Sequence, residues 1–134
     1  MSQAKCRILC IDDHEDTSEM LKLLLLQEDY DVTVAVSCAA ALEQARDGNF
    51  DLYVLDRRLP DGSGLKLCQK LAKVTPGVPS IFYTGDAYDI HRSEGLAAGA
   101  TDYITKPDIE RLIESVRDLL TERECARTAA SQTT

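Results

Sequence analysis

The chain has 134 residues, of which 44% are hydrophobic and 28% charged, with a net charge of −8 and a pI of about 4.7. This length is enough for one domain with a substantial core. The acidic balance argues against a main role in binding nucleic-acid phosphates. The sequence contains no run of about 20 apolar residues, the length that a membrane-spanning helix needs. The five cysteines form no CxxC motif, so we expect a reducing cytoplasm and neither a disulfide framework nor a zinc site.

Short apolar runs rich in β-forming residues alternate along the chain with longer segments of helical periodicity. In chain order, the predicted elements are strand 6–11, helix 15–27, strand 31–36, helix 39–46, strand 51–56, helix 64–74, strand 79–84, helix 90–98, strand 101–105 and helix 109–121. The buried stripe of the first helix is predicted to contain Met20, Leu23, Leu24 and Leu26. The alternation is typical of βαβ units and predicts one domain over residues 1–122, with a parallel sheet covered by helices on both faces. Residues 123–134 are small and polar and are predicted to form a C-terminal tail.

Chemically active side chains follow four of the five predicted strands. In strand order they are Asp12 and Asp13, Asp56, Thr84 with Gly85, and Lys106. In open parallel α/β sheets, ligands bind beyond the carboxyl ends of the strands, where the strand order reverses. If the first and third strands are neighbours there, three carboxylates converge. This predicts a flavodoxin-like (βα)5 three-layer sandwich with a five-stranded parallel sheet in the order 2-1-3-4-5.

Three carboxylates in one crevice suit a hard divalent cation such as Mg²⁺ or Mn²⁺. The charges of that cation and of Lys106 would offset the three carboxylates, so the crevice could accept a phosphoryl group. Asp56 stands alone at its strand end and is the candidate nucleophile, with Thr84 and Lys106 on neighbouring strands. Phosphorylation would change the charge of Asp56 from −1 to about −2 and attract the Thr84 hydroxyl and the Lys106 ammonium.

The stretches CIDDHED, YVLDRRLPDGSGL, SIFYTGD and GATDYITKP, in this order and spacing, resemble the receiver domain of bacterial two-component response regulators. The resemblance covers roughly residues 5–122. It implies that Asp12, Asp13 and Asp56 bind Mg²⁺ together with the backbone carbonyl of Arg58. It also implies that Asp56 is the phosphoacceptor.

The same resemblance implies a switch. Thr84 would be the switch hydroxyl, Lys106 would contact the phosphoryl group, and the Lys106–Pro107 peptide bond would be cis. Tyr103 would be the rotating aromatic residue, whose ring turns inward when Thr84 moves toward a phosphoryl oxygen. The face formed by the fourth helix, fifth strand and fifth helix would then change shape, and a partner that prefers one shape would detect the change.

Departures from the family pattern concentrate at the rim of the predicted site, which comprises Arg57, Arg58, Gly85 and Asp86. Arg57 follows Asp56 at a position where the family often has an apolar residue. Arg58 and Asp86 occupy positions that, in the family, flank the entrance for attacking water. We hypothesise that these two residues form an ion pair that slows hydrolysis of the acyl phosphate.

The leading interpretation is a single-domain response regulator rather than an enzyme, with self-phosphorylation and slow autodephosphorylation as its only reactions. It would receive a phosphoryl group from a histidine kinase or a histidine phosphotransfer protein and then bind a downstream protein target. Alternatives are a phosphorelay intermediate or a receiver segment of a larger hybrid protein. A haloacid-dehalogenase-type phosphatase is less favoured, because that class has an Asp two residues after its nucleophile, where this chain has Arg58.

Two further expectations concern association. The stretch KPDIERL lacks the aromatic residue after Lys-Pro, and the charge pattern, that many dimerising DNA-binding regulators have. We therefore expect a monomer without direct contact to nucleic acid or membrane. His14 and His91 are isolated histidines and have no predicted role.

Overall fold

The computed structural model describes residues 5–85 and 88–122. Its main sheet has the strand order β2-β1-β3-β6-β7, and all neighbouring strands are parallel. The strands are β1 (Arg7–Ile11), β2 (Asp31–Ala35), β3 (Leu52–Leu55), β6 (Ser80–Thr84) and β7 (Asp102–Thr105). The helices are α1 (Glu15–Gln27), α2 (Cys38–Gly48), α3 (Gly64–Val74), α4 (Asp89–Ala97) and α5 (Ile109–Glu122). The predicted order 2-1-3-4-5 is therefore confirmed.

The strand numbering is shifted because sequence reasoning missed a small antiparallel hairpin. It consists of β4 (Arg58–Leu59) and β5 (Gly62–Ser63), and it lies between β3 and α3. Two-residue strands are too short to show an alternating pattern of apolar and polar residues. The hairpin is important for the site because it turns the chain directly after Asp56.

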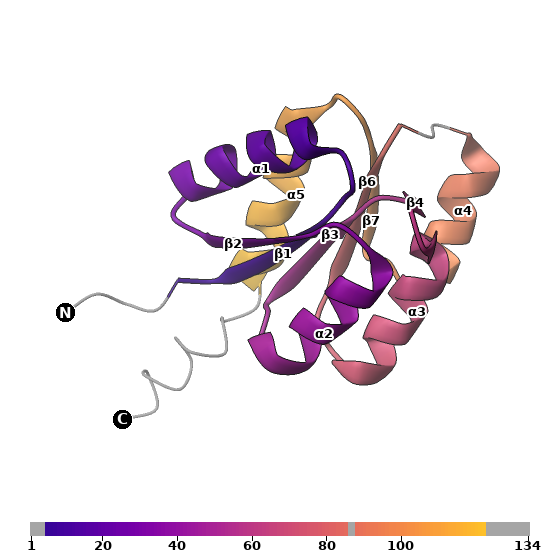
Figure 1. Ribbon diagram of the computed structural model, residues 1–134. Coiled ribbons are helices and arrows are strands. Elements are labelled where there is room, and N and C mark those ends of the chain that lie inside the picture. Colours follow the sequence, from indigo (N-terminus) through magenta and orange to yellow (C-terminus); the bar gives the residue numbers. More distant parts are fainter. Residues whose placement is uncertain (1–4, 86–87, 123–134) are drawn as a thin grey trace.

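The sheet separates two hydrophobic clusters, as expected for helices on both faces (Figure 1). Helices α1 and α5 cover one cluster, whereas α2 and α3 cover the other, and α4 packs beside them. All residues of β3 and β6 are buried, which explains why β3 and the centre of β6 are apolar; Ser80 and Thr84 at the ends of β6 are buried polar residues. Within the described ranges, no helix is long and apolar enough to cross a membrane.

The predicted buried stripe of α1 is wrong. The helix buries Ser18, Leu21 and Leu25, whereas Met20, Leu23 and Leu26 are 38%, 64% and 40% exposed. The buried positions are three and four residues apart, which is the spacing of one helix face. Four consecutive leucines extend around most of a helical turn, so their presence does not indicate which side faces the sheet.

The N-terminus of α2 is capped twice. The Ser37 hydroxyl accepts a hydrogen bond from the Ala40 backbone N–H at 3.1 Å. The Asp61 carboxylate, from the β4–β5 turn, accepts hydrogen bonds from the Cys38 and Ala39 backbone N–H groups at 2.7 and 3.0 Å. These two hydrogen bonds lower the pKa of Asp61. The hairpin after Asp56 is thereby attached to α2.

Three cysteines agree with the expectation of free thiols and one does not. Cys10, Cys38 and Cys68 are free, whereas Cys6 is disulfide-bonded. Burial, followed by the nearby charge of Asp12, raises the pKa of Cys10 to about 12. Cys10 therefore behaves as a buried apolar residue rather than as a reactive thiol.

Candidate functional site

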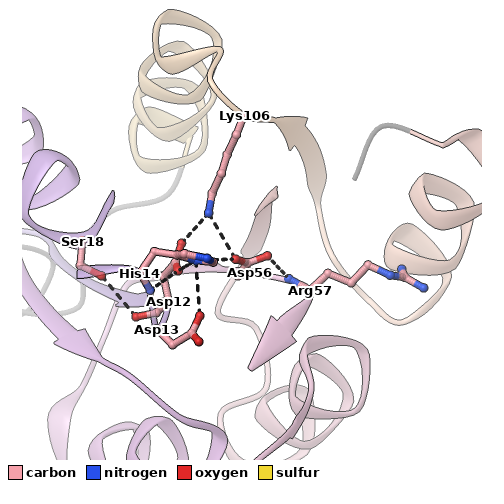
Figure 2. Close-up of polar contacts among 7 residues, drawn as sticks. All are labelled: Asp12, Asp13, His14, Ser18, Asp56, Arg57 and Lys106. Atoms are coloured by element: carbon pink, nitrogen blue, oxygen red, sulfur yellow. Dashed lines mark hydrogen bonds and ion pairs between the residues drawn. The ribbon is translucent and has the colours of Figure 1, made fainter. Parts of the chain in front are cut away.

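The carboxyl ends of neighbouring parallel strands bring predicted site residues together, and Figure 2 shows Asp12, Asp13, Asp56 and Lys106 among them. Asp12 follows β1 and Asp56 follows β3, and they are only 3% and 5% exposed. Thr84 ends β6 and is also buried, whereas the side chain of Asp13 is 40% exposed. A pocket of about 650 Å³ opens over this edge, with Asp56, Thr84 and Lys106 among its lining residues. The structure therefore brings these residues together at the edge of the sheet where the sequence predicts the site.

Lys106 connects two of the carboxylates. Its Nζ atom lies 2.8 Å from Asp12 Oδ2 and 3.2 Å from Asp56 Oδ2. Burial alone would lower the pKa of Lys106, but the hydrogen bond to Asp12 and the charge of Asp56 outweigh it, and the pKa is raised. The ammonium is therefore held in its charged form between two buried acids, within reach of any group attached to Asp56.

His14 was assigned no role from the sequence, yet its imidazole lies among the acids. Nδ1 is 2.8 Å from Asp12 Oδ1, 3.4 Å from Asp13 Oδ1 and 3.6 Å from Asp56 Oδ2. The hydrogen bond to Asp12 and the charge of that residue raise the pKa of His14. The missed signal was its place in the chain, because a residue directly after the acids at a strand end faces the same crevice.

The donor set fits a divalent cation. One ligand atom from each of Asp12, Asp13, His14 and Asp56 can be chosen so that all four lie within 4.8 Å of one another. Two of the three carboxylates are buried, where their mutual repulsion is poorly screened. Mg²⁺ prefers oxygen ligands and binds through one or two carboxylates, water and phosphate oxygens. Asp12, Asp13 and Asp56 would be the residues that hold it.

Comparison with known proteins identifies the architecture. The sequence matches the response regulator receiver domain family over residues 8–117. The chain belongs to this family. It is 38% identical over 114 residues to the probable transcriptional regulatory protein TcrX of Mycobacterium tuberculosis, covering 84% of this chain and 49% of that protein. The chain thus spans about half the length of the curated relatives it matches.

Solved structures agree with this assignment. A CheY-like response regulator receiver domain protein from Methanospirillum hungatei is 33% identical, with a TM-score of 0.84 over 89% of this chain and 96% of that one. A response regulator from Burkholderia pseudomallei, solved with a phosphorylated aspartic acid, a calcium ion and citrate, is 28% identical. Its TM-score is 0.76 over 81% of this chain and 65% of that one. A receiver domain is a phosphoacceptor module of two-component systems, and the family binds Mg²⁺ at an acidic pocket, which this chain reproduces in its Asp-rich group.

In this receiver domain, Arg57 does not point into the pocket, although it was predicted at the rim. Its backbone N–H donates to Asp56 Oδ1 at 2.7 Å, while its side chain extends away from the acids (Figure 2). The guanidinium donates to the His91 carbonyl at 3.2 Å and contacts Glu94 Oε1 at 2.8 Å. The side chain of Arg57 is only 13% exposed and that of Glu94 is 47% exposed, so Arg57 joins the site to α4 through a half-exposed ion pair.

Two of the other three predicted rim residues lie within the described part of the chain. Arg58 begins β4 and lines the pocket, as does Gly85. The metal contact of the Arg58 carbonyl stays a prediction. Asp86 lies outside the described residues, and so does the predicted ion pair between Arg58 and Asp86.

Tyr103 is already inside the protein. Its ring is 2% exposed and lies 5.7 Å from the ring of Phe82. A Cβ atom on Gly95 of α4 would come within 2.8 Å of Tyr103 Cδ2, so only glycine allows α4 to cover the ring this closely. The Lys106–Pro107 peptide bond is cis, as the resemblance implied.

Gly64, at the start of α3, supports the site from behind. A Cβ atom there would lie 2.1 Å from the Asp56 carbonyl oxygen and 2.9 Å from Arg57 Cα. The Gly64 N–H donates to the Arg57 carbonyl at 2.7 Å. The start of α3 therefore packs directly against the backbone that carries Asp56, and the missing side chain makes this contact possible.

Proposed function

We propose that this receiver domain is a phosphorylatable switch in which Asp56 accepts a phosphoryl group from a phosphohistidine of a partner kinase or phosphotransfer protein. The observation that carries the proposal is the position of Lys106, whose ammonium connects the buried carboxylates of Asp12 and Asp56 at the floor of an open pocket. Its positive charge is placed where negative charge develops during phosphoryl transfer.

In the transfer step, a carboxylate oxygen of Asp56 attacks the phosphorus atom and the P–N bond of the phosphohistidine breaks. The leaving imidazole keeps the bonding electron pair and takes up a proton, and Asp56 becomes an acyl phosphate. The Arg57 N–H orients the carboxylate through its hydrogen bond to Oδ1, and Lys106 balances the added charge. A bound Mg²⁺ would supply further neutralisation of the phosphoryl oxygens.

Phosphorylation would change the balance of attractions on Lys106. The ammonium is now shared between Asp12 and Asp56. When Asp56 carries about two negative charges, Lys106 should bind it more strongly than Asp12. The hydroxyl of Thr84, on the adjacent strand β6, would donate to a phosphoryl oxygen, and the packing around Tyr103 would adjust to that movement.

The output of the switch belongs to the same proposal. We infer that residues 1–122 form a cytoplasmic domain that acts by binding a downstream protein. This domain would be either a separate regulator, a phosphorelay intermediate or a segment of a hybrid protein. The matched relatives include proteins named as transcriptional regulatory proteins, which are about twice as long as this chain. The prediction of no direct nucleic-acid contact therefore gains no support from them, and the monomeric state is likewise a proposal.

Intact-mass measurement tests the central claim. The protein is incubated with acetyl phosphate and Mg²⁺, in parallel with Asp56→Asn and with Asp47→Asn, which alters an exposed acid on α2. The wild type and Asp47→Asn should each gain one phosphoryl group, and chelation of Mg²⁺ should abolish the gain. Labelling of Asp56→Asn to the wild-type extent would place the acceptor elsewhere and overturn the proposal.

A further inference from the structure

His14 lies at metal-ligand spacing from every acid of the site. Neighbouring ligands around an octahedral ion with bonds of 2.0–2.1 Å are about 3 Å apart. The Nδ1 atom of His14 is 2.8, 3.4 and 3.6 Å from oxygens of Asp12, Asp13 and Asp56. Small movements of the four side chains would therefore place all four donor atoms around one ion. Figure 2 shows the imidazole between the carboxylates and below Lys106.

The backbone also fixes the position of His14. The residue is the N-cap of α1 with an extended conformation, φ −84° and ψ 107°. Its own N–H donates to Asp12 Oδ1 at 2.8 Å, so the residue is bonded to the first acid through its main chain as well as its ring. The side chain is 65% exposed, which leaves room for the ring to reorient around an ion. The backbone of His14 is thus held in place, whereas its imidazole ring is free to change orientation.

We propose that His14 is a nitrogen ligand in the metal site of this receiver domain and that it gives the site a preference for divalent first-row transition-metal ions. This inference rests on the acidic metal site of the proposed function and adds a residue and a metal class to it. Imidazole nitrogen suits ions such as Co²⁺, Cu²⁺ and Zn²⁺, whereas Mg²⁺ and Mn²⁺ prefer oxygen ligands and water. With Mg²⁺ the imidazole would stay outside the coordination sphere, and with Co²⁺ it would enter it.

Coordination requires the Nδ1 lone pair. In the metal-free protein, a proton on Nδ1 can donate to Asp12 Oδ1, which lies 2.8 Å away. When the imidazole binds an ion, that proton leaves Nδ1 for solvent, and the Asp12 oxygen becomes available to the same ion. The histidine and the aspartate therefore change from partners of each other into ligands of one cation.

Direct metal binding tests the inference. Co²⁺ and Mg²⁺ affinities are measured by calorimetry for the wild type, for His14→Ala and for His91→Ala, the last being a control that alters the only other histidine of the chain. His14→Ala should lower Co²⁺ affinity at least about tenfold and change Mg²⁺ affinity less than about twofold. His91→Ala should leave both affinities unchanged. An equal change for both ions in His14→Ala, or no change, would overturn the inference.

Pulsed electron paramagnetic resonance of bound Cu²⁺, a paramagnetic ion that imidazole suits, gives a second readout. A nitrogen coupling should be present in the wild type and in His91→Ala and absent in His14→Ala. Lack of the coupling in the wild type would refute ligation by His14. Mg²⁺-dependent labelling by acetyl phosphate then separates the two proposals. If His14→Ala is labelled normally but the wild type shows no nitrogen coupling, the ligand inference fails and the proposed function stands. If the coupling is present but Asp56 is never labelled, the function fails and the metal site stands.

Discussion

Arg57 and Glu94 form a 2.8 Å ion pair that joins the residue after the proposed phosphoacceptor to α4. The main chain of the same arginine donates to Asp56 Oδ1 at 2.7 Å. One residue therefore contacts the reacting carboxylate with its backbone and the helix with its side chain. This connection runs along the loop after β3.

Breaking the Arg57–Glu94 pair should loosen α4. We expect Arg57→Ala to reduce the free energy of unfolding by about 1 kcal/mol, the upper range for ion pairs open to solvent, because Glu94 is half exposed. Amide hydrogen exchange within α4 should accelerate. Glu94→Gln should give a weaker form of the same effect, and Arg58→Ala is the neighbouring control. Unchanged exchange in α4 for Arg57→Ala would show that the contact does not restrain the helix.

Substitutions of Lys106 and Asp13 should have opposite effects on the stability of the metal-free protein. Lys106→Ala leaves two buried carboxylates without their shared ammonium, and we expect a loss of about 1–2 kcal/mol after allowing for solvent in the pocket. Asp13→Asn removes one of the repelling charges and should leave stability equal or higher. Denaturant unfolding with and without Mg²⁺ measures both, and Mg²⁺ should restore much of the loss in Lys106→Ala. Destabilisation by Asp13→Asn would contradict this view of the cluster.

His14 should titrate above its ordinary pKa of 6.5 in the metal-free protein, because the hydrogen bond to Asp12 and its negative charge favour the imidazolium. A raised folded pKa means that the stabilisation is fully present below about pH 6.5 and is lost as the pH rises past the raised value. Nuclear magnetic resonance of the imidazole follows the titration directly. Asp12→Asn should move the midpoint back toward 6.5, and a midpoint below 6.5 in the wild type would disprove the assignment.

Gly64 and Gly62 provide a matched pair of substitutions. Gly64→Ala would force a methyl group to within 2.1 Å of the Asp56 carbonyl oxygen, whereas at Gly62 the nearest atom would be Cys38 Sγ at 3.5 Å. We expect Gly64→Ala to cost about 2–3 kcal/mol of stability, as overpacking usually does, and to slow labelling of Asp56. Gly62→Ala should leave both within error. Equal effects of the two substitutions would mean that the close approach has no structural importance.

The Asp61 cap of α2 predicts an acid-dependent effect. Its pKa is lowered by the two N–H groups it binds, so its stabilisation is present above the ordinary pKa of 3.8 and is lost as the pH falls through the lower folded value. Asp61→Asn should therefore destabilise the protein at pH 7, and the difference from wild type should shrink as the solution is acidified toward pH 2. Thermal unfolding at several pH values measures this. A difference that is constant with pH would show that the charge of Asp61 does not matter.

The fold and the acidic site could be predicted from the sequence because both depend on periodicity. Alternating strand and helix patterns lead to a parallel sheet, and a parallel sheet brings all strand ends to one edge. The strand and helix pattern therefore predicts that Asp12, Asp56 and Lys106 lie together. The cis bond before Pro107 followed from resemblance to the family alone.

The features that the sequence pattern did not predict depend on three-dimensional distances, which periodicity does not specify. The buried face of α1 is decided by its packing on the sheet, and four adjacent leucines do not reveal it. Gly64 matters because two backbone segments that are eight residues apart approach each other closely. His14 belongs to the site because its ring turns back over the acids, which requires the geometry of the helix start.

The sheet also separates the surroundings of Tyr103 from those of its neighbour in the chain. Its ring belongs to the hydrophobic cluster shared with α2 and α3, and α4 covers it at Gly95. The next residue, Ile104, faces the other cluster, with α5. A displacement of the ring would therefore push on α4 directly, while α5 would be affected only through a shift of strand β7. A protein bound to α4 would respond directly to a movement of the Tyr103 ring, whereas a protein bound to α5 would respond only to the smaller, indirect displacement of that helix.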